Sequence, residues 1–182
     1  PLLLGGLVAR AACGIAEKEG HRWRRKLTRL VCLGAPHQGA ALERAGHWVD
    51  LLLGISRYSA PLAQLGKIRS AGVTDLRYGN VQDADWQGRD RFAAEGDRRK
   101  GLPLPEGVAC YAMAGTTTRR KGSRGKLAGD GLVSVDSALG RHVNPRLRLE
   151  LPEANQWIAH DTGHVALLGR RAVYPKLRAW LR

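Results

Sequence analysis

The sequence predicts an α/β fold, in which a parallel sheet of buried strands is flanked by helices. The run LTRLVCLGAP (27–36) is compact and apolar and ends in Gly and Pro, and GVACYAMAGTT (107–117) is a second run of this kind. Continuous apolar strands are typical of parallel sheets covered on both faces. A helical pattern precedes the first run and another closes the chain, so helices alternate with strands, as right-handed crossovers require.

The first expected helix covers residues 5–19 and is followed by a polar connection at 21–26. Its apolar residues recur at helical spacing, and Glu17 to Glu19 close its polar end before Gly20. The residues that predict its buried face are Leu7, Val8, Ala11, Ala12 and Ile15.

The C-terminal third predicts a further strand region and a last helix. RLRLELP (146–152) together with QWIAH (156–160) gives the third strand region. The segment 170–182 is amphipathic, and Pro175 is tolerated if it lies near the first turn of a helix.

A long insertion, residues 41–106, separates the first two strands. Its first part contains the apolar stretches WVDLLLGI and PLAQL, and its second part is polar and rich in Gly and Asp. Because a structureless loop of this length is unusual in a compact domain unless it covers a site, the insertion is predicted to be a lid with helices. Residues 1–182 otherwise make up a single domain.

The net charge of +14 comes mostly from arginine scattered along 182 residues, with clusters at 21–26, 97–100 and 119–126. Such a balance can attract nucleic acid or an anionic membrane. No nucleic-acid motif accompanies it, so solvated surface charge is favoured, nucleic acid is not expected as a partner, and a membrane surface stays open. The odd count of three cysteines, without C-x-x-C spacing, predicts buried thiols rather than disulfides or a zinc site.

Three loops are expected at the carboxyl ends of the strands, where reactive side chains lie in parallel α/β sheets. They contain PLLLGG (1–6), AGDGLVSVDSALG (128–140) and HDTGHVALLG (160–169). The second loop carries an acid and the third carries a histidine. This is one of the orders in which the three residues of a catalytic triad follow one another along a chain, namely nucleophile, Asp and His.

With these motifs the chain resembles the C-terminal part of an α/β-hydrolase of the lipase and esterase type, in particular the bacterial relatives of the GPI inositol-deacylase group. The stretches that carry the resemblance, in family order, are GGLVARAA (5–12), VCLGAPHQGAALE (31–43), GDGLVSVDSALG (129–140) and GHVALL (163–168). The resemblance implies a parallel sheet flanked by helices, with its N-terminal strands missing upstream of Pro1 and a helical lid inserted. Any targeting signal would also lie upstream, which leaves the compartment open, with the cytoplasm as the default.

The resemblance makes Asp130 the catalytic acid and His164 the catalytic base. A carboxylate that accepts a hydrogen bond from one ring nitrogen orients a histidine for proton transfer at the other. The alternative for Asp130 is a turn residue in GDG. His37 matches a position expected to form hydrogen bonds around the pocket, Asp136 is interpreted as a helix cap, and His160 as a residue beside the site or on the surface.

The position of the nucleophile is occupied by Leu3, whose side chain has no proton to lose and no lone pair for attack. The backbone N–H of Leu4 is the candidate for one half of an oxyanion hole. The resemblance therefore implies a serine hydrolase of carboxylic or lipid esters whose own chain is inactive, either as a truncated or frame-disrupted product or as an inactive relative. Acyl transfer by the same triad stays open.

Neither a metal nor another cofactor is expected, because the triad needs none and no ligand cluster is visible. The other class of function is a non-catalytic module whose basic surface binds acidic lipid or nucleic acid. If a preceding strand is missing, the strand at 28–34 has a free apolar edge, which predicts poor solubility or self-association.

Overall fold

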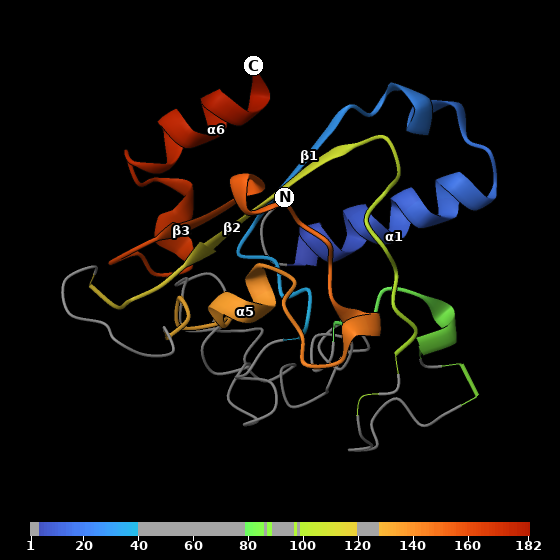
Figure 1. Cartoon of the computed structure of the whole chain (residues 1–182), viewed down its shortest axis with the longest axis horizontal. Helices are drawn as coiled ribbons and strands as arrows, with labels where there is room; N and C mark the ends of the chain where they lie inside the picture. Colours follow the sequence, from blue (N-terminus) through green and yellow to red (C-terminus); the bar gives the residue numbers. More distant parts are fainter. Residues whose placement is uncertain (1–3, 40–78, 86, 89–96, 98, 120–127) are drawn as a thin grey trace, which may run out of the picture.

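The computed structural model of the chain describes the following residues: 4–39, 79–85, 87–88, 97, 99–119 and 128–182. Within these residues three parallel strands form one sheet in the order β1-β2-β3: β1 Arg29–Leu33, β2 Ala109–Gly115 and β3 Gln156–Ala159 (Figure 1). The predicted parallel sheet and its two apolar strands are thus confirmed. The lid predicted at 41–106 falls mostly outside the described residues.

Helices cover both faces of the sheet, and the core has a layer on each side. Helix α1 (Leu4–Lys18) and the short helix α5 (Val135–Ala138) lie on one face, and α6 (Val173–Leu181) lies on the other (Figure 1). The first layer joins sheet residues such as Cys32 and Ala112 to the leucines and valines around α5. The second layer joins Met113 to Trp180, whose ring stacks on Tyr111 with centroids 5.0 Å apart.

Helix α1 forms where it was expected, but with a different buried face. Val8 and Ile15 are 64% and 54% exposed, so they are not part of the core. The buried residues are instead Gly6, Leu7, Arg10, Cys13 and Ala16. Small residues bring the helix close to the sheet, because a Cβ on Gly6 would lie 2.4 Å from Cβ of Ala35. Close backbone approach at Gly6 therefore accompanies the burial of Leu7, Cys13 and Ala16 on this face.

The prediction of a strand at 146–152 is wrong, whereas the strand at Gln156–Ala159 forms. Leu147, Leu149 and Leu151 alternate with exposed residues and are buried, which explains the strand-like pattern. The segment pairs with no strand among the described residues, and Leu149 instead donates its N–H to the carbonyl of Gly140 beside α5. Proline on both sides, which has no N–H to donate, also interrupts any ladder.

Short 3₁₀ turns connect the larger elements: η1 Arg22–Lys26, η4 Asp83–Asp85, η5 Pro145–Leu147, η6 Glu153–Asn155 and η7 Val165–Leu168. The cap of α5 differs from the prediction, because the hydroxyl of Ser134 accepts the N–H of Ser137 and Asp136 lies in the first turn. Pro175 lies in the first turn of α6, as predicted.

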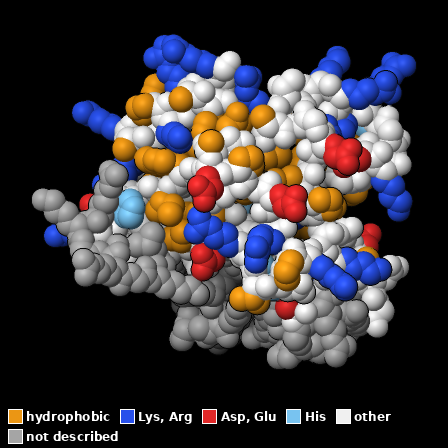
Figure 2. All heavy atoms as spheres, viewed as in Figure 1, with side chains coloured by type: hydrophobic (Ala, Val, Ile, Leu, Met, Phe, Trp, Pro, Cys, Tyr) orange, Lys and Arg blue, Asp and Glu red, His pale blue; other side chains and the backbone are white. Residues whose placement is uncertain are grey.

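On the face seen in Figure 2, Lys and Arg side chains project around the rim, and hydrophobic side chains lie across the middle. Among the described residues, no helix is long and apolar enough to cross a membrane. The outer edge of β1 pairs with no strand in this part of the chain. Self-association through that edge stays a prediction, which sedimentation at increasing protein concentration checks.

Candidate functional site

The carboxyl ends of the three strands bring together Gly34, Asp130 and His164, one residue from the loop after each strand. Nδ1 of His164 lies 2.6 Å from Oδ2 of Asp130, and both side chains are buried. The structure thus places the two residues that the sequence singled out as acid and base in direct contact, although 34 positions separate them.

Asp130 is held by a tight turn of its own loop. Its Oδ1 accepts the backbone N–H groups of Leu132 (3.0 Å) and Val133 (2.8 Å), and its own N–H donates to the carbonyl of Val133. Gly131 makes this turn possible with a φ of +100°, which residues with a Cβ rarely adopt. Because Oδ1 is occupied by backbone donors, Oδ2 remains for the imidazole. Asp130 is therefore a turn residue and the partner of His164 at once.

His164 is fixed by its backbone and by the close approach of Gly34. Its N–H donates to the carbonyl of Asp130 at 3.0 Å. A Cβ on Gly34, whose φ is +56°, would lie 2.9 Å from Cε1 of the imidazole, so only glycine leaves room for the ring. The buried Nε2 has no hydrogen-bond partner among the described residues. This nitrogen is the free end of the pair.

The end of β2 ties the loops of Asp130 and His164 together. Thr116 donates its N–H to the carbonyl of Ala159 at the end of β3 and accepts the N–H of Thr162 at 2.8 Å. Thr117 donates to the carbonyl of Gly129, one residue before the acid. These bonds set the distance between the loops without involving the reactive side chains, so the pair is preorganised by the sheet.

The start of α1 lies next to this site, because Gly6 packs against Ala35, the neighbour of Gly34. Helix α1 begins at Leu4, so the N–H of Leu4 belongs to the first turn, where backbone donors have no partner within the helix. Leu3 lies outside the described residues.

His37 is buried, but its contacts differ from those of His164. Its Nδ1 lies 3.2 Å from Nη1 of Arg10, a buried residue of α1. Burial, and then the charge of Arg10, lower the pKa of His37 well below its usual value. Burial also lowers the pKa of Arg10 to about 10. His37 therefore stays neutral and accepts a hydrogen bond from the guanidinium.

Two further residues hold the segment around His37, and sequence reasoning missed both. Arg99 donates to the carbonyls of His37 and Gly79, and Gln38 donates its side-chain amide to the carbonyls of Gly140 and Leu147. Asp97 balances Arg99: burial acts to raise the pKa of Asp97, but the hydrogen bonds and charge of Arg99 hold it below its usual value.

One sequence signal was available for this cluster. Arg10 lies three residues from both Leu7 and Cys13, on the same helix face, and an arginine among apolar residues on one face indicates a buried partner. Arg99 and Gln38 had no such signal, since their partners are far away in the sequence.

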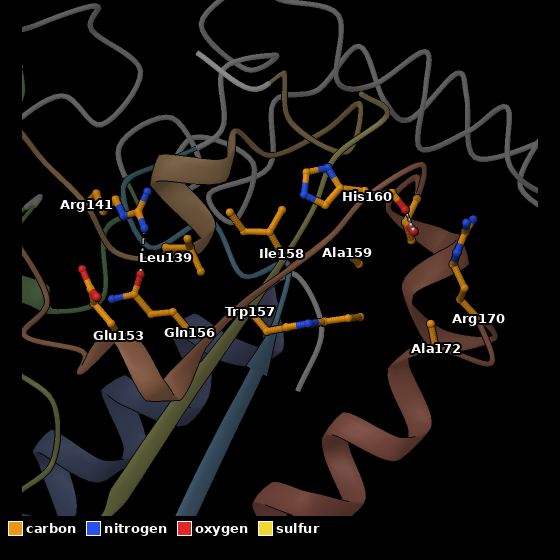
Figure 3. A pocket seen from close by; sticks show the side chains of 11 residues that line it. Leu139, Arg141, Glu153, Gln156, Trp157, Ile158, Ala159, His160, Arg170 and Ala172 are labelled. Carbon is orange, nitrogen blue, oxygen red and sulfur yellow. Dashed lines mark hydrogen bonds between the residues drawn. The ribbon is translucent and has the colours of Figure 1, made fainter. Parts of the chain in front are cut away.

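His160 does not contact the Asp130–His164 pair through a hydrogen bond but lines a separate pocket beside β3 (Figure 3). Its Nδ1 is buried without a hydrogen-bond partner in the described part of the chain. No group of three or more His, Cys, Asp or Glu residues that could hold a metal occurs among the placed residues.

No protein-family model matches the sequence, and no curated protein sequence matches it. Among solved structures, the chain is similar to the mature form of the Bacillus licheniformis lipase BlEst2, with 16% sequence identity and a TM-score of 0.40. The match covers 84% of this chain and 54% of the lipase chain, so the chain spans about half the length of that structure. Similarity at this level does not establish a shared fold, and the activity named there is said of the lipase.

Proposed function

We propose that the chain supplies the acid and the base of an α/β-hydrolase-like site for carboxylic esters, with lipid esters as the favoured class. The observation that carries this proposal is the buried hydrogen bond from His164 to Asp130, with Nε2 of the imidazole left without a partner in the described residues. A general base needs one ring nitrogen open to the substrate and the other held by a carboxylate, and His164 has this combination among the described residues.

In the proposed reaction Nε2 of His164 takes the proton of a serine hydroxyl as its oxygen attacks the ester carbonyl. The carboxylate of Asp130 stabilises the resulting imidazolium, and His164 then returns the proton to the leaving alcohol. The N–H of Leu4 is the proposed donor to the oxyanion, because it opens helix α1 beside the site. The serine then passes its acyl group to an acceptor. Water as the acceptor gives hydrolysis, and a second alcohol as the acceptor gives acyl transfer.

The chain itself is proposed to be inactive, because Leu3 occupies the position of the nucleophile. Leu3→Ser restores a hydroxyl there. We expect this variant to hydrolyse a short-chain p-nitrophenyl ester, either in this chain or, where the reading frame continues upstream, in the longer product.

The matched controls separate a site from incidental reactivity. Leu3→Ser combined with His164→Ala should lose the activity, and the unchanged Leu3 protein should have none. The proposal would be contradicted if folded Leu3→Ser protein hydrolysed no ester, both as this chain and as the longer product. It would also be contradicted if the activity of Leu3→Ser survived the addition of His164→Ala. Circular dichroism confirms that each variant is folded.

A second candidate is a non-catalytic module that binds an anionic lipid surface. It is favoured by turn η1, where Arg22, Arg25 and Lys26 are exposed beside Trp23, which is 44% exposed. Basic residues attract acidic headgroups, and an exposed tryptophan suits a membrane interface. Cosedimentation with phosphatidylserine vesicles, but not with phosphatidylcholine vesicles, and its loss at high salt would favour this candidate.

A further inference from the structure

Helix α1 contacts the loop that follows β1 at two points. Near the start of the helix Gly6 packs against Ala35, and a Cβ on Gly6 would lie 2.4 Å from the Cβ of the alanine. One helical turn further along, on the same face, Nη1 of Arg10 lies 3.2 Å from Nδ1 of His37. Two contacts one turn apart fix the direction of a helix, whereas a single contact lets it pivot.

The same loop forms a wall of the Asp130–His164 pair. A Cβ on Gly34 would lie 2.9 Å from Cε1 of His164 and 3.2 Å from Oδ2 of Asp130, so the loop backbone lies against both side chains. Gly34 is also tied to the sheet, since its N–H donates to the carbonyl of Met113 at 2.8 Å. The loop therefore connects α1 to the acid and the base.

Arg10 is buried in this contact without a carboxylate partner among the described residues. Its Nη1 and Nη2 face neutral acceptors, the ring of His37 and the carbonyl of Leu102, and its Nε has no partner in this part of the chain. Burying such a cation costs free energy, and an apolar side chain of similar length often stabilises a position of this kind as well or better. What the guanidinium adds here is a directed contact with the loop.

Arg99 holds the loop from its other side. It donates to the carbonyl of His37 at 3.1 Å and to the side-chain oxygen of Gln38 at 3.0 Å. Unlike Arg10, it has a carboxylate partner, Asp97. Arg99 thus fixes the backbone of the loop, and Arg10 ties that fixed loop to helix α1.

We propose that Arg10 is a positioning residue, which acts through His37 to hold helix α1 at a fixed distance from the acid–base pair. This inference rests on the proposed function, because the distance matters only if position 3 and the N–H of Leu4 work together with Nε2 of His164. Arg10 itself contacts no reacting atom. A misplacement of about 1 Å between reacting groups can lower a rate by about 10²-fold.

The first test uses the unchanged Leu3 protein and follows the Nδ1 proton of His164 by NMR. Arg10→Met combined with His37→Leu removes the donor and the acceptor of the contact together. We expect exchange of the Nδ1 proton with water to become at least roughly tenfold faster, because the loop beside the ring loosens. Urea unfolding confirms that the variant is folded under the conditions of the measurement.

Arg24→Met is the matched control for this measurement. Arg24 also ties α1 to a distant segment, through Glu17 and the carbonyl of Glu106, but at the far end of the helix. Its loss should change the exchange rate at His164 by less than about twofold, as expected for a distant site.

The second test measures kinetics in a Leu3→Ser version that hydrolyses ester. The double change at Arg10 and His37 should lower kcat roughly 10–100-fold with KM changed less than twofold. His37→Gln keeps an acceptor for Arg10 and should retain most of the activity, whereas His37→Leu alone should lower kcat as the double change does. These single variants keep the test decisive if the double variant does not fold.

The positioning role is overturned if the exchange rate at His164 and kcat stay unchanged without the Arg10–His37 contact. It is also overturned if Arg24→Met changes the exchange rate equally, since α1 would then act only through its stability. A Leu3→Ser protein without activity would contradict the proposed function instead, and the exchange measurement, which needs no serine, would still decide the positioning role.

Discussion

The two histidines that are buried in the described part of the chain, His164 and His37, are held by partners of opposite kind. Nδ1 of His164 faces a carboxylate, which accepts a hydrogen bond, and Nδ1 of His37 faces a guanidinium, which donates one. A carboxylate at Nδ1 therefore favours a proton on Nδ1 of His164, and a guanidinium at Nδ1 favours a proton on Nε2 of His37. Both follow strands and both are excluded from water, so the partner alone makes one a candidate base and the other a neutral acceptor.

The largest expected difference between the two histidines is in catalysis. In a serine-bearing version that hydrolyses ester, Asp130→Asn should lower kcat by about 10³–10⁴-fold, because an asparagine no longer holds His164 in the required tautomer. His37→Gln should lower kcat by less than about tenfold, since glutamine still accepts from Arg10. Steady-state kinetics with the same ester measures kcat of both variants. Comparable losses of kcat in the two variants would contradict the different roles of the two histidines.

The space for the His164 ring depends on Gly34, and a second glycine provides a control. Gly34→Ala combines a strained φ with a clash against the imidazole, and we expect a loss of about 2–4 kcal/mol in the free energy of unfolding. Gly20→Ala has a similar φ of +69° but nothing within 4 Å, and should cost about 1–2 kcal/mol. Urea unfolding compares the two, and equal costs would mean that Gly34 does not confine the ring.

The lowered pKa of His37 predicts a pH dependence of stability. Below about pH 6.5 the unfolded chain takes up a proton at this residue while the folded protein does not, so stability falls as the pH falls. Relative to His37→Gln, the unchanged protein should lose about 1 kcal/mol per pH unit between about pH 6 and 5. Parallel stability curves for the two proteins would contradict the neutral, arginine-bonded state.

The sequence predicted the elements whose residues carry a local signal. The apolar runs became β1, which is buried on one face and half-buried on the other, and β2, which is mostly buried on both faces, and Pro175 fits the first turn of α6. Asp130 and His164 were found because their loops follow strands and resemble a known order of motifs. Whether the two residues catalyse a reaction stays a prediction.

What could not be predicted depends on contacts between distant segments. The buried face of α1 includes the close approach of Gly6 to Ala35, and the leucines at 147, 149 and 151 are buried without joining the sheet. The contacts of Arg10 and Arg99 with His37 span 27 and 62 positions, so neither leaves a repeating pattern in the sequence.

The most direct test of the proposed site is the tautomeric state of the two histidines in the unchanged protein, measured from the ¹⁵N chemical shifts of their rings near pH 7. We predict that His164 carries its proton on Nδ1 with Nε2 free as an acceptor, and that Asp130→Asn alters this state. His37 serves as the internal reference, with its proton on Nε2 in both proteins. A proton on Nε2 of His164, or a ring that does not respond to Asp130→Asn, would contradict its role as the base.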